Sequence, residues 1–402
     1  MLFRSLIIIA LWLATPASSS SAAPGHHLDT QTLRIAALNA AMGFESAGEL
    51  SRRLQSKNDP KLLKLTEILQ RVRPDVVLLS EMDYQEGLDT AALLNAHYLS
   101  IARPGLQAIE YPHHYAAPVN TGLDSGLDLD GNGRLGDPGD AWGYGRFPGQ
   151  YGMLLLSRIE IDNDSARSFQ TFHWSAMPGA MEPRAPGGEA FYPEDVWSRL
   201  RLSSKSHWDA PIQFNGARIH LLASHPTPPA FDGSEDRNGR RNHDEIRLWA
   251  DYILGDKAHY LVDDSGQRGG LDSNAHFVIL GDLNADPHDG DSSASAMDQL
   301  LSHPRVNTDC TPGSAGGQAA SSAQGGANLL HKGDAALDTA DFDDRYAGNL
   351  RVDYALPSRS LTVLDCGVFW PIAGTPGAEA AGFSDHRLVW IDVQVPGQHH
   401  TR

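Results

Sequence analysis

The sequence predicts an α+β fold built from stacked β-sheets. Its 402 residues are 41% hydrophobic and 20% charged, a composition typical of a globular protein with a large core. Short apolar runs of strand length recur along the chain, and stretches with helical spacing are few. Because strands and helices do not alternate regularly, a doubly wound parallel sheet is disfavoured. The length fits one large domain or two ordinary ones.

The expected elements follow the chain in order. The apolar runs predict strands at Leu33–Ala40, Asp75–Glu81, Tyr151–Arg158, Ala217–His225, His276–Asp282, Arg351–Pro357 and His386–Val393. Apolar residues at helical spacing predict helices over Pro60–Val72 and Asn242–Leu254. Asp59 is placed to cap the first helix, with Pro60 in its first turn.

Two regions are expected to be insertions in one domain spanning residues 30–396. Residues 104–149 are rich in Gly, Asp and Pro. Residues 311–333 are rich in Gly, Ala, Ser and Gln, a composition that predicts a flexible surface loop.

The N-terminus predicts an exported protein. Arg4 provides a positive start, residues 6–13 form an apolar run, and small residues follow, which is the pattern of a signal peptide over residues 1–23. The alternative is a membrane anchor, but the run is shorter than the roughly 18 residues that a span requires. We therefore expect a secreted or periplasmic monomer without an integral membrane span. In that compartment Cys310 and Cys366 either form one disulfide or remain two buried thiols.

The charge of the chain limits its partners. The formal net charge is −18 and no run is rich in Lys or Arg. Proteins that bind nucleic acid through its backbone usually carry a basic patch, so this composition disfavours that function. It does not exclude a nuclease, because a bound divalent ion supplies local positive charge.

Polar residues stand at the ends of the predicted strands. One such residue is ordinarily a cap or a turn residue. Here the pattern repeats on six strands, and stacked sheets would bring those ends to one rim. The residues are Asn39, Glu81, His225, Asp282 with Asn284, Asp353, and Asp385 with His386.

The order of these motifs resembles the endonuclease/exonuclease/phosphatase superfamily, which includes pancreatic-type deoxyribonucleases, abasic-site endonucleases, inositol polyphosphate 5-phosphatases and sphingomyelinases. The resemblance rests on the blocks "LNA", "LLSEMD", "YGMLLLSR", "ASHPTP", "GDLNADP", "RVDY" and "SDHRLVWIDV" between residues 33 and 395. It implies a four-layer α/β/β/α sandwich with two stacked, mainly antiparallel sheets, one metal-dependent site and cleavage of a phosphate ester. Several members place a phosphate-contacting tyrosine just before the strand that reads "YGMLLLSR" here, and Gln150 and Tyr151 fall beside that place.

The chemistry of phosphate ester hydrolysis suggests a role for each residue. Negative charge grows on the phosphoryl and leaving oxygens, and a hard cation neutralises it. The candidate ligands Asn39, Glu81 and Asp385, with Asp282 as a further candidate, offer only oxygen, which favours Mg²⁺ or Mn²⁺ over zinc.

The remaining polar residues are expected to handle water and phosphate. Asp282 is expected to activate or orient the attacking water, and Asn284 is expected to donate a hydrogen bond to a phosphoryl oxygen. His225 and His386 are expected to flank the phosphate, with Asp353 orienting His386.

Two other motifs lie outside this series. Asp128, Asp130 and Asn132 followed by Gly133 form the first half of a calcium loop, although position twelve is Gly139 rather than an acid. A structural Ca²⁺ site and a merely polar loop both remain open. Arg240 and Arg241 are either substrate-binding residues or part of a solvated helix start.

We therefore expect an exported, bacterial-type metal-dependent phosphoesterase acting on a small phosphorylated compound or a phospholipid headgroup. The alternatives are an extracellular metal-dependent nuclease and a non-catalytic secreted binding protein with the same fold.

Overall fold

The computed structural model describes residues 31–293 and 295–395. The predicted signal peptide lies outside these residues. Within them, none of the helices is long and apolar enough to cross a membrane.

The regular elements of the described chain are strands and mostly short helices. The strands are β1 (Leu33–Met42), β2 (Val76–Met82), β3 (His113–Tyr115), β4 (Met153–Ser157), β5 (Arg167–Ser168), β6 (His207–Phe214), β7 (Ala217–Ser224), β8 (His276–Asp282), β9 (Ala340–Asp341), β10 (Asn349–Leu350), β11 (Asp353–Pro357), β12 (Thr362–Phe369) and β13 (Leu388–Gln394). The α-helices are α1 (Glu49–Ser56), α2 (Pro60–Val72), α3 (Thr90–Leu94), α4 (Glu194–Trp197), α5 (Arg237–Ile253), α6 (Asp298–Leu301), α7 (Ala315–Gln324) and α8 (Ala378–Ala381).

The strands form two main sheets, and each sheet is antiparallel except for one parallel pair of strands. One sheet has the order β12-β13-β1-β2-β4-β3 and the other the order β11-β8-β7-β6-β5. Each contains one parallel pair, β1 with β2 and β7 with β8, and its other neighbours are antiparallel. The prediction of two mainly antiparallel sheets is confirmed.

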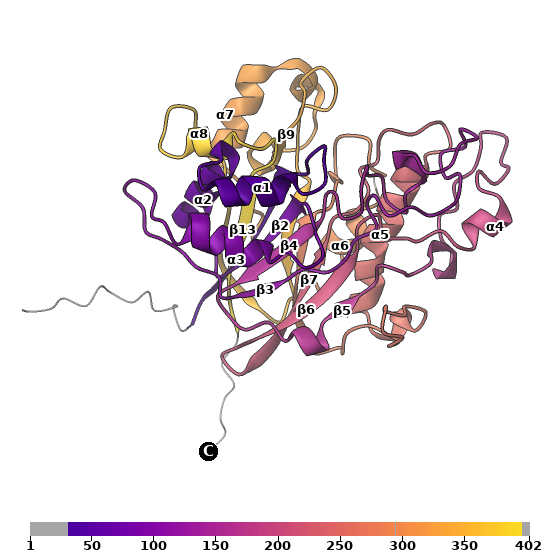
Figure 1. The fold of residues 1–402 in the computed structure, drawn as a ribbon, viewed down its shortest axis with the longest axis horizontal. Coiled ribbons are helices and arrows are strands. Elements are labelled where there is room, and N and C mark those ends of the chain that lie inside the picture. The colour runs from indigo at the N-terminus through magenta and orange to yellow at the C-terminus, as the bar shows by residue number, and fades with distance from the viewer. Residues whose placement is uncertain (1–30, 294, 396–402) are drawn as a thin grey trace, which may run out of the picture. The chain divides into compact units, whose positions relative to one another are not determined.

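Three of the four apolar clusters of the described residues define four layers. Along β1, Ile35 and Ala37 join a cluster shared with Leu221 and Val278 of the other sheet, so this cluster fills the space between the sheets. The alternate residues of β1 pack against α1, α2, α3 and α8. A third cluster lies between the second sheet and α5 and α6. Figure 1 shows these helices on the outer sides of the strands, as an α/β/β/α sandwich requires.

Several elements match their sequence signals closely. The helix α2 has the predicted bounds, and the Asp59 side chain accepts hydrogen bonds from the backbone N–H groups of Lys61 and Leu62 at 2.9 and 3.1 Å. The helix α5 begins at Arg237 rather than at Asn242. Its first turn is polar, so the apolar spacing from which it was predicted begins later.

The segment over residues 311–333, expected to be a flexible loop, contains the helix α7. Ser314 caps it by accepting a hydrogen bond from the Gly317 N–H at 3.0 Å. Gly316 lies so close to the Trp370 carbonyl that a Cβ atom would collide with it. Small residues therefore mark close helix packing here. The disulfide between Cys310 and Cys366 joins the chain before this helix to β12.

A buried carboxylate beyond α7 predicts a pH-dependent stability. Burial raises the pKa of Asp338 to about 8, and the nearby charges of Asp286, Asp289 and Asp334 add to the effect. The folded state therefore holds a proton that the unfolded state releases above about pH 4, so this group's contribution to stability falls as pH rises towards 8. Asp338→Asn is expected to melt a few degrees above wild type at pH 9 and near wild type at pH 4.5, as measured by differential scanning calorimetry.

The matched control for this prediction is Asp309→Asn, which removes one exposed carboxylate from a neighbouring segment. An equal gain in both variants at pH 9 would mean that lower net charge, rather than the burial of Asp338, is responsible.

Candidate active site

The two sheets bring the predicted strand-end residues together. Asn39 and Glu81 come from the parallel pair β1 and β2 of one sheet. His225 follows β7 and Asp282 ends β8 in the other sheet, where Asp353 of β11 lies directly opposite Asp282. His386 precedes β13. The rim expected from the repeated pattern is therefore present.

Backbone geometry fixes the position of Asp282. The preceding residue, Gly281, has a φ of 146°, and a Cβ atom there would collide with the Ser224 carbonyl oxygen of β7. The glycine thus permits β8 to approach β7 closely, which holds Asp282 beside His225. The backbone N–H of Asn284 donates to Asp282 Oδ1 at 2.9 Å and fixes the carboxylate.

The other oxygen of Asp282 is the point on which the site converges. Asn39 Nδ2 donates to Asp282 Oδ2 at 3.1 Å, His225 Nε2 lies at 3.4 Å and His386 Nε2 at 3.7 Å from the same atom. Burial raises the pKa of Asp282 to about 6, and the charge on His386 opposes that rise. A carboxylate with a raised pKa in this setting is suited to accept a proton near neutral pH.

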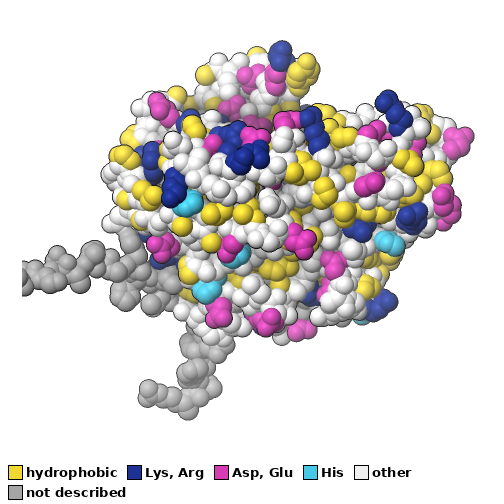
Figure 2. All heavy atoms as spheres, in the orientation of Figure 1, with side chains coloured by type: hydrophobic (Ala, Val, Ile, Leu, Met, Phe, Trp, Pro, Cys, Tyr) yellow, Lys and Arg dark blue, Asp and Glu magenta, His cyan; other side chains and the backbone are white. Residues whose placement is uncertain are grey.

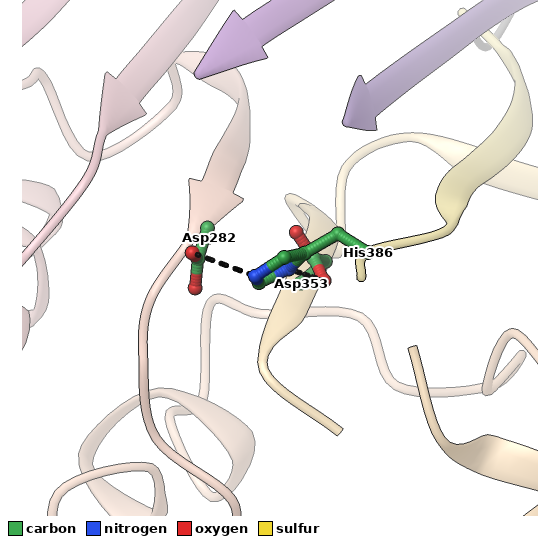
Figure 3. Close-up of side chains that lie close together, drawn as sticks. All are labelled: Asp282, Asp353 and His386. Carbon is green, nitrogen blue, oxygen red and sulfur yellow. Dashed lines mark hydrogen bonds and ion pairs between the residues drawn. The ribbon is translucent and has the colours of Figure 1, made fainter. Parts of the chain in front are cut away.

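His386 is held between two aspartates, as Figure 3 shows. Its Nδ1 lies 2.8 Å from Asp353 Oδ2, and its Nε2 faces Asp282. Burial alone would lower the pKa of His386, but the charges of Asp353 and Asp282 outweigh burial and raise it to about 10. The imidazole is therefore cationic at neutral pH and presents an Nε2–H towards the centre of the site.

His225 differs in charge from His386. It is only 3% exposed, and its Nδ1 is buried without a hydrogen-bond partner among the described residues. Burial, together with the nearby charges of Lys205 and His386, holds its pKa well below the usual value. The site therefore combines one cationic and one neutral imidazole beside the same oxygen of Asp282.

Glu81 is the carboxylate best placed to bind a metal ion. It has a φ of 56°, a strained conformation for a residue with a side chain. Burial raises the pKa of Glu81, and one of its oxygens accepts from Asn39 Nδ2 at 3.1 Å. Asn39 Oδ1 already accepts from the Ala41 N–H at 3.0 Å. Asn39 therefore bridges Glu81 and Asp282 as a hydrogen-bond donor, and its Oδ1 keeps one further lone pair that a metal ion would use.

The donor set fits a hard divalent cation. Ligand atoms of Asp282, Asp353 and His386 also lie within 4.8 Å of one another. His386 Nδ1 and Asp353 Oδ2 are, however, already paired with each other at 2.8 Å. Glu81 with Asp282 offers the better oxygen donors, and a cation there would offset two crowded carboxylates.

Two other predicted site residues, Asp385 and Asn284, have side chains without a described contact to Asp282 Oδ2. The Asp385 side chain is exposed, and its described contact is with Ser384 Oγ at 3.4 Å. Asn284 Nδ2 donates to the Pro226 carbonyl oxygen at 3.0 Å and so ties the loop after β8 to the residue that follows His225.

The two candidate substrate-binding arginines make contacts with the backbone. Arg241 is bound to the carbonyl oxygens of Leu202, Trp142 and Arg201 at 2.8, 2.6 and 3.0 Å. Arg240 Nη1 lies 3.5 Å from the Glu182 carbonyl oxygen. The structure thus gives Arg241 a structural role, holding the segment before Lys205.

Two residues beside the site were not singled out as functional residues in the sequence. Lys205 is 6% exposed; burial lowers its pKa, and the charges of Glu245, Glu81 and Asp282 oppose this. Burial and the charge of Glu81 raise the pKa of Tyr151, whose ring packs over Gly43. Tyr151, which falls beside the place of the phosphate-contacting tyrosine in several family members, therefore lies close to Glu81. Lys205 stands outside any apolar strand pattern, so no sequence signal identified it.

The sandwich and its rim of carboxylates, histidines and asparagine define a class of phosphoester-cleaving, metal-dependent hydrolases. A sequence model of the Endonuclease/Exonuclease/phosphatase family matches residues 36–386, and the chain belongs to this family. Comparison with curated protein sequences gave no significant match.

Several solved structures are similar to this chain at low sequence identity. An endonuclease/exonuclease/phosphatase from Beutenbergia cavernae DSM 12333 is 16% identical with a TM-score of 0.50, over 91% of this chain and 72% of that chain. Sphingomyelinase C from Streptomyces griseocarneus is 15% identical with a TM-score of 0.43, over 91% and 100% of the two chains. TDP2 from D. rerio, complexed with single strand DNA product, is 12% identical with a TM-score of 0.44, over 90% and 99%.

Proposed function

We propose that this protein is an exported, divalent-metal-dependent phosphoesterase that hydrolyses a small phosphorylated compound or a phospholipid headgroup ester. The observation that carries the proposal is the convergence of Asn39, His225 and His386 on one oxygen of Asp282, beside Glu81. This arrangement offers a proton acceptor, hydrogen-bond donors for an anion and a metal-binding carboxylate in one place.

Each side chain has a distinct task in this proposal. A divalent ion held by Glu81, when bound, supplies positive charge for the phosphoryl oxygens. Asp282 accepts a proton from the attacking water. The hydrogen bond from Asn39 holds the Asp282 carboxylate in position. The cationic His386 donates Nε2–H to the phosphate, and His225 contacts it from the other flank. Lys205 lies close enough to Glu81 and Asp282 to interact with their charges.

The surface charge favours a small substrate over a nucleic acid. On the face shown in Figure 2, the Lys and Arg side chains of the described residues are scattered among Asp and Glu. With a formal net charge of −18, the chain would repel the backbone of a polynucleotide at low salt.

The predicted insertion over residues 104–149 supplies a candidate surface for recognising the rest of the substrate. A cavity of about 500 Å³ is lined by Val119, Leu123 and Phe147 from this insertion and by Asp83 and Tyr84, which follow β2. Because Glu81 lies near the end of the same strand, an organic leaving group could extend from the metal-binding carboxylate towards this cavity.

A substrate panel tests the proposal. With Mg²⁺, hydrolysis of bis-p-nitrophenyl phosphate or p-nitrophenyl phosphate is expected, and EDTA should abolish it. Phosphomonoesters and sphingomyelin are expected to be cleaved faster than plasmid, single-stranded DNA or RNA at physiological salt. Glu81→Gln, purified in the same way, controls for contaminating hydrolases.

Two results would contradict the proposal. Rapid, salt-sensitive cutting of plasmid as the best reaction would identify a nuclease instead. No metal-dependent hydrolysis of any substrate would favour a non-catalytic binding protein.

Export is supported by two independent features. One is the charged start and short apolar run at residues 4–13, and the other is the disulfide between Cys310 and Cys366. Disulfides persist in oxidising compartments. The intact mass of the protein recovered from the periplasm or medium of an expressing bacterium would reveal whether residues 1–23 have been removed.

A further inference from the structure

We propose that the segment Asp128–Asp140 binds a structural Ca²⁺ ion through the carboxylates of Asp128, Asp130 and Asp140, at a site separate from the candidate active site. One carboxylate oxygen from each of these residues lies within 4.8 Å of the other two. The proposal does not depend on the proposed phosphoesterase function.

The structure supplies the acid that the sequence motif lacks. In the motif D-x-D-x-N-G, Asp128, Asp130 and Asn132 occupy positions one, three and five, and a calcium loop then requires an acid at position twelve. Position twelve is Gly139, but the short helical turn Pro138–Asp140 brings the next residue back to the loop. Asp140 Oδ1 accepts from the Leu129 N–H at 2.9 Å, which fixes this carboxylate between Asp128 and Asp130.

An unsatisfied buried oxygen independently indicates a ligand. Asp140 is 0% exposed, and its Oδ2 is buried without a hydrogen-bond partner among the described residues. Burying a carboxylate oxygen without a hydrogen-bond partner destabilises the folded state, and more so when the carboxylate is charged. A cation between Asp140 and the two other carboxylates would remove that cost.

The chemistry of the loop selects calcium among common cations. The donors are all oxygens, without His or Cys, which disfavours zinc. Gly131 and Gly133 have φ values of 76° and 78°, so the backbone turns tightly around the aspartates, as it does in loops that surround Ca²⁺ with many oxygens. Mg²⁺ demands six-fold octahedral geometry and keeps most of its water, so it gains less from such a loop.

The proposed Ca²⁺ site directly precedes Trp142 and Gly143, which contact residues beside the active site. The Trp142 carbonyl oxygen, two residues beyond Asp140, accepts from Arg241. Gly143 packs so closely on the Ser204 carbonyl that a Cβ atom would collide with it. Ser204 directly precedes Lys205. Bound Ca²⁺ would therefore stabilise the frame behind Lys205 without touching the reacting groups.

The test uses the full chain, freed of metal with EDTA and dialysed. Addition of Ca²⁺ is expected to raise the melting temperature by several degrees, because an ion that binds only the native state stabilises it, whereas excess Mg²⁺ should not reproduce the shift. Asp130→Ala and Asp140→Asn should both lose the shift. Asp124→Asn serves as the matched control and should keep the shift, because Asp124 is an exposed aspartate that precedes this segment and lies outside the cluster.

Calorimetric titration with Ca²⁺ alone separates this site from the catalytic one. Ca²⁺ binding should persist in Glu81→Gln and disappear in Asp130→Ala, whose partly exposed side chain makes misfolding less of a risk than at Asp140. An unchanged melting temperature in Ca²⁺, an equal shift with Mg²⁺, or Ca²⁺ binding lost in Glu81→Gln and kept in Asp130→Ala would each overturn the proposal.

Discussion

Asp282→Asn is expected to lower turnover by about 10²- to 10⁴-fold while leaving the protein folded. Three nitrogen atoms, from Asn39, His225 and His386, lie within 3.1 to 3.7 Å of Asp282 Oδ2. The amide of the Asp282→Asn variant cannot accept a proton from water. It would also present either an NH₂ group or a carbonyl oxygen, a weaker acceptor than a carboxylate, to these three nitrogen atoms. The loss should therefore appear in kcat rather than in KM.

The matched control is Asp291→Asn, which removes an exposed carboxylate from the loop after the same strand. Single-turnover rates at saturating Mg²⁺ for both variants, together with melting temperatures, separate chemistry from stability. Equal rates for Asp282→Asn and wild type would contradict the role of Asp282 as proton acceptor, whatever the control shows.

The burial of Asp282 gives a reason to expect a change in stability as well. Since its folded pKa is raised to about 6, the ionised carboxylate is destabilising above that pH, and the neutral amide removes this cost. A variant that is inactive yet melts at or above the wild-type temperature would show that the charge is kept for function.

Sequence reasoning predicted those parts of the site that sit on strong strand signals. The apolar run of β8 ends at Asp282, and β7 ends beside His225, so the strand pattern alone placed both residues at a rim. Stacking of the sheets then set the distances. The four layers were implied by the resemblance to the family, and alternate residues of β1 face different clusters, as that arrangement requires.

The remaining features depend on contacts that local patterns do not encode. Lys205 lies in a short Ser-rich connection, and only its three-dimensional proximity to Glu81 and Asp282 reveals it. The hydrogen bond of Asn39 Oδ1 to a backbone N–H two residues away redirects its amide, which no spacing rule predicts. Asp140 completes an acidic cluster from the thirteenth position of a twelve-residue motif, because a short helical turn folds it back.

Asp353 and His386 are expected to act as one unit. Asp353→Asn should lower turnover by as much as about 10⁴-fold, because the loss of a comparable orienting carboxylate has that effect in other hydrolases. The structural basis is the 2.8 Å contact between Asp353 Oδ2 and His386 Nδ1, which fixes the ring and favours its charged form. The Asp353 N–H donates a hydrogen bond to the Thr339 side-chain oxygen Oγ1 at 2.9 Å, so the backbone of the amide variant should keep its place.

A double-mutant cycle distinguishes a shared role from separate ones. His386→Ala is expected to do damage similar to that of Asp353→Asn, and the double variant should be hardly worse than the worse single variant, because residues that work as a unit are non-additive. Asp341→Asn is the matched control, since that carboxylate pairs with Arg387 at 2.7 Å, one residue beyond His386, and faces a different partner. It should remain within a few-fold of wild type.

Each departure from this pattern has a definite meaning. If the two losses multiply, Asp353 and His386 serve the reaction independently, and the 2.8 Å contact is incidental to catalysis. If Asp353→Asn stays within a few-fold of wild type while His386→Ala is inactive, the imidazole needs no orienting carboxylate, because Asp282 alone keeps it charged and aligned. Single-turnover rates for the wild type, the two single variants and the double variant, at saturating Mg²⁺, decide among these outcomes. Coupled loss is the outcome we expect, since both side chains are almost fully buried and His386 can turn its Nε2 towards Asp282 only while Asp353 holds its Nδ1.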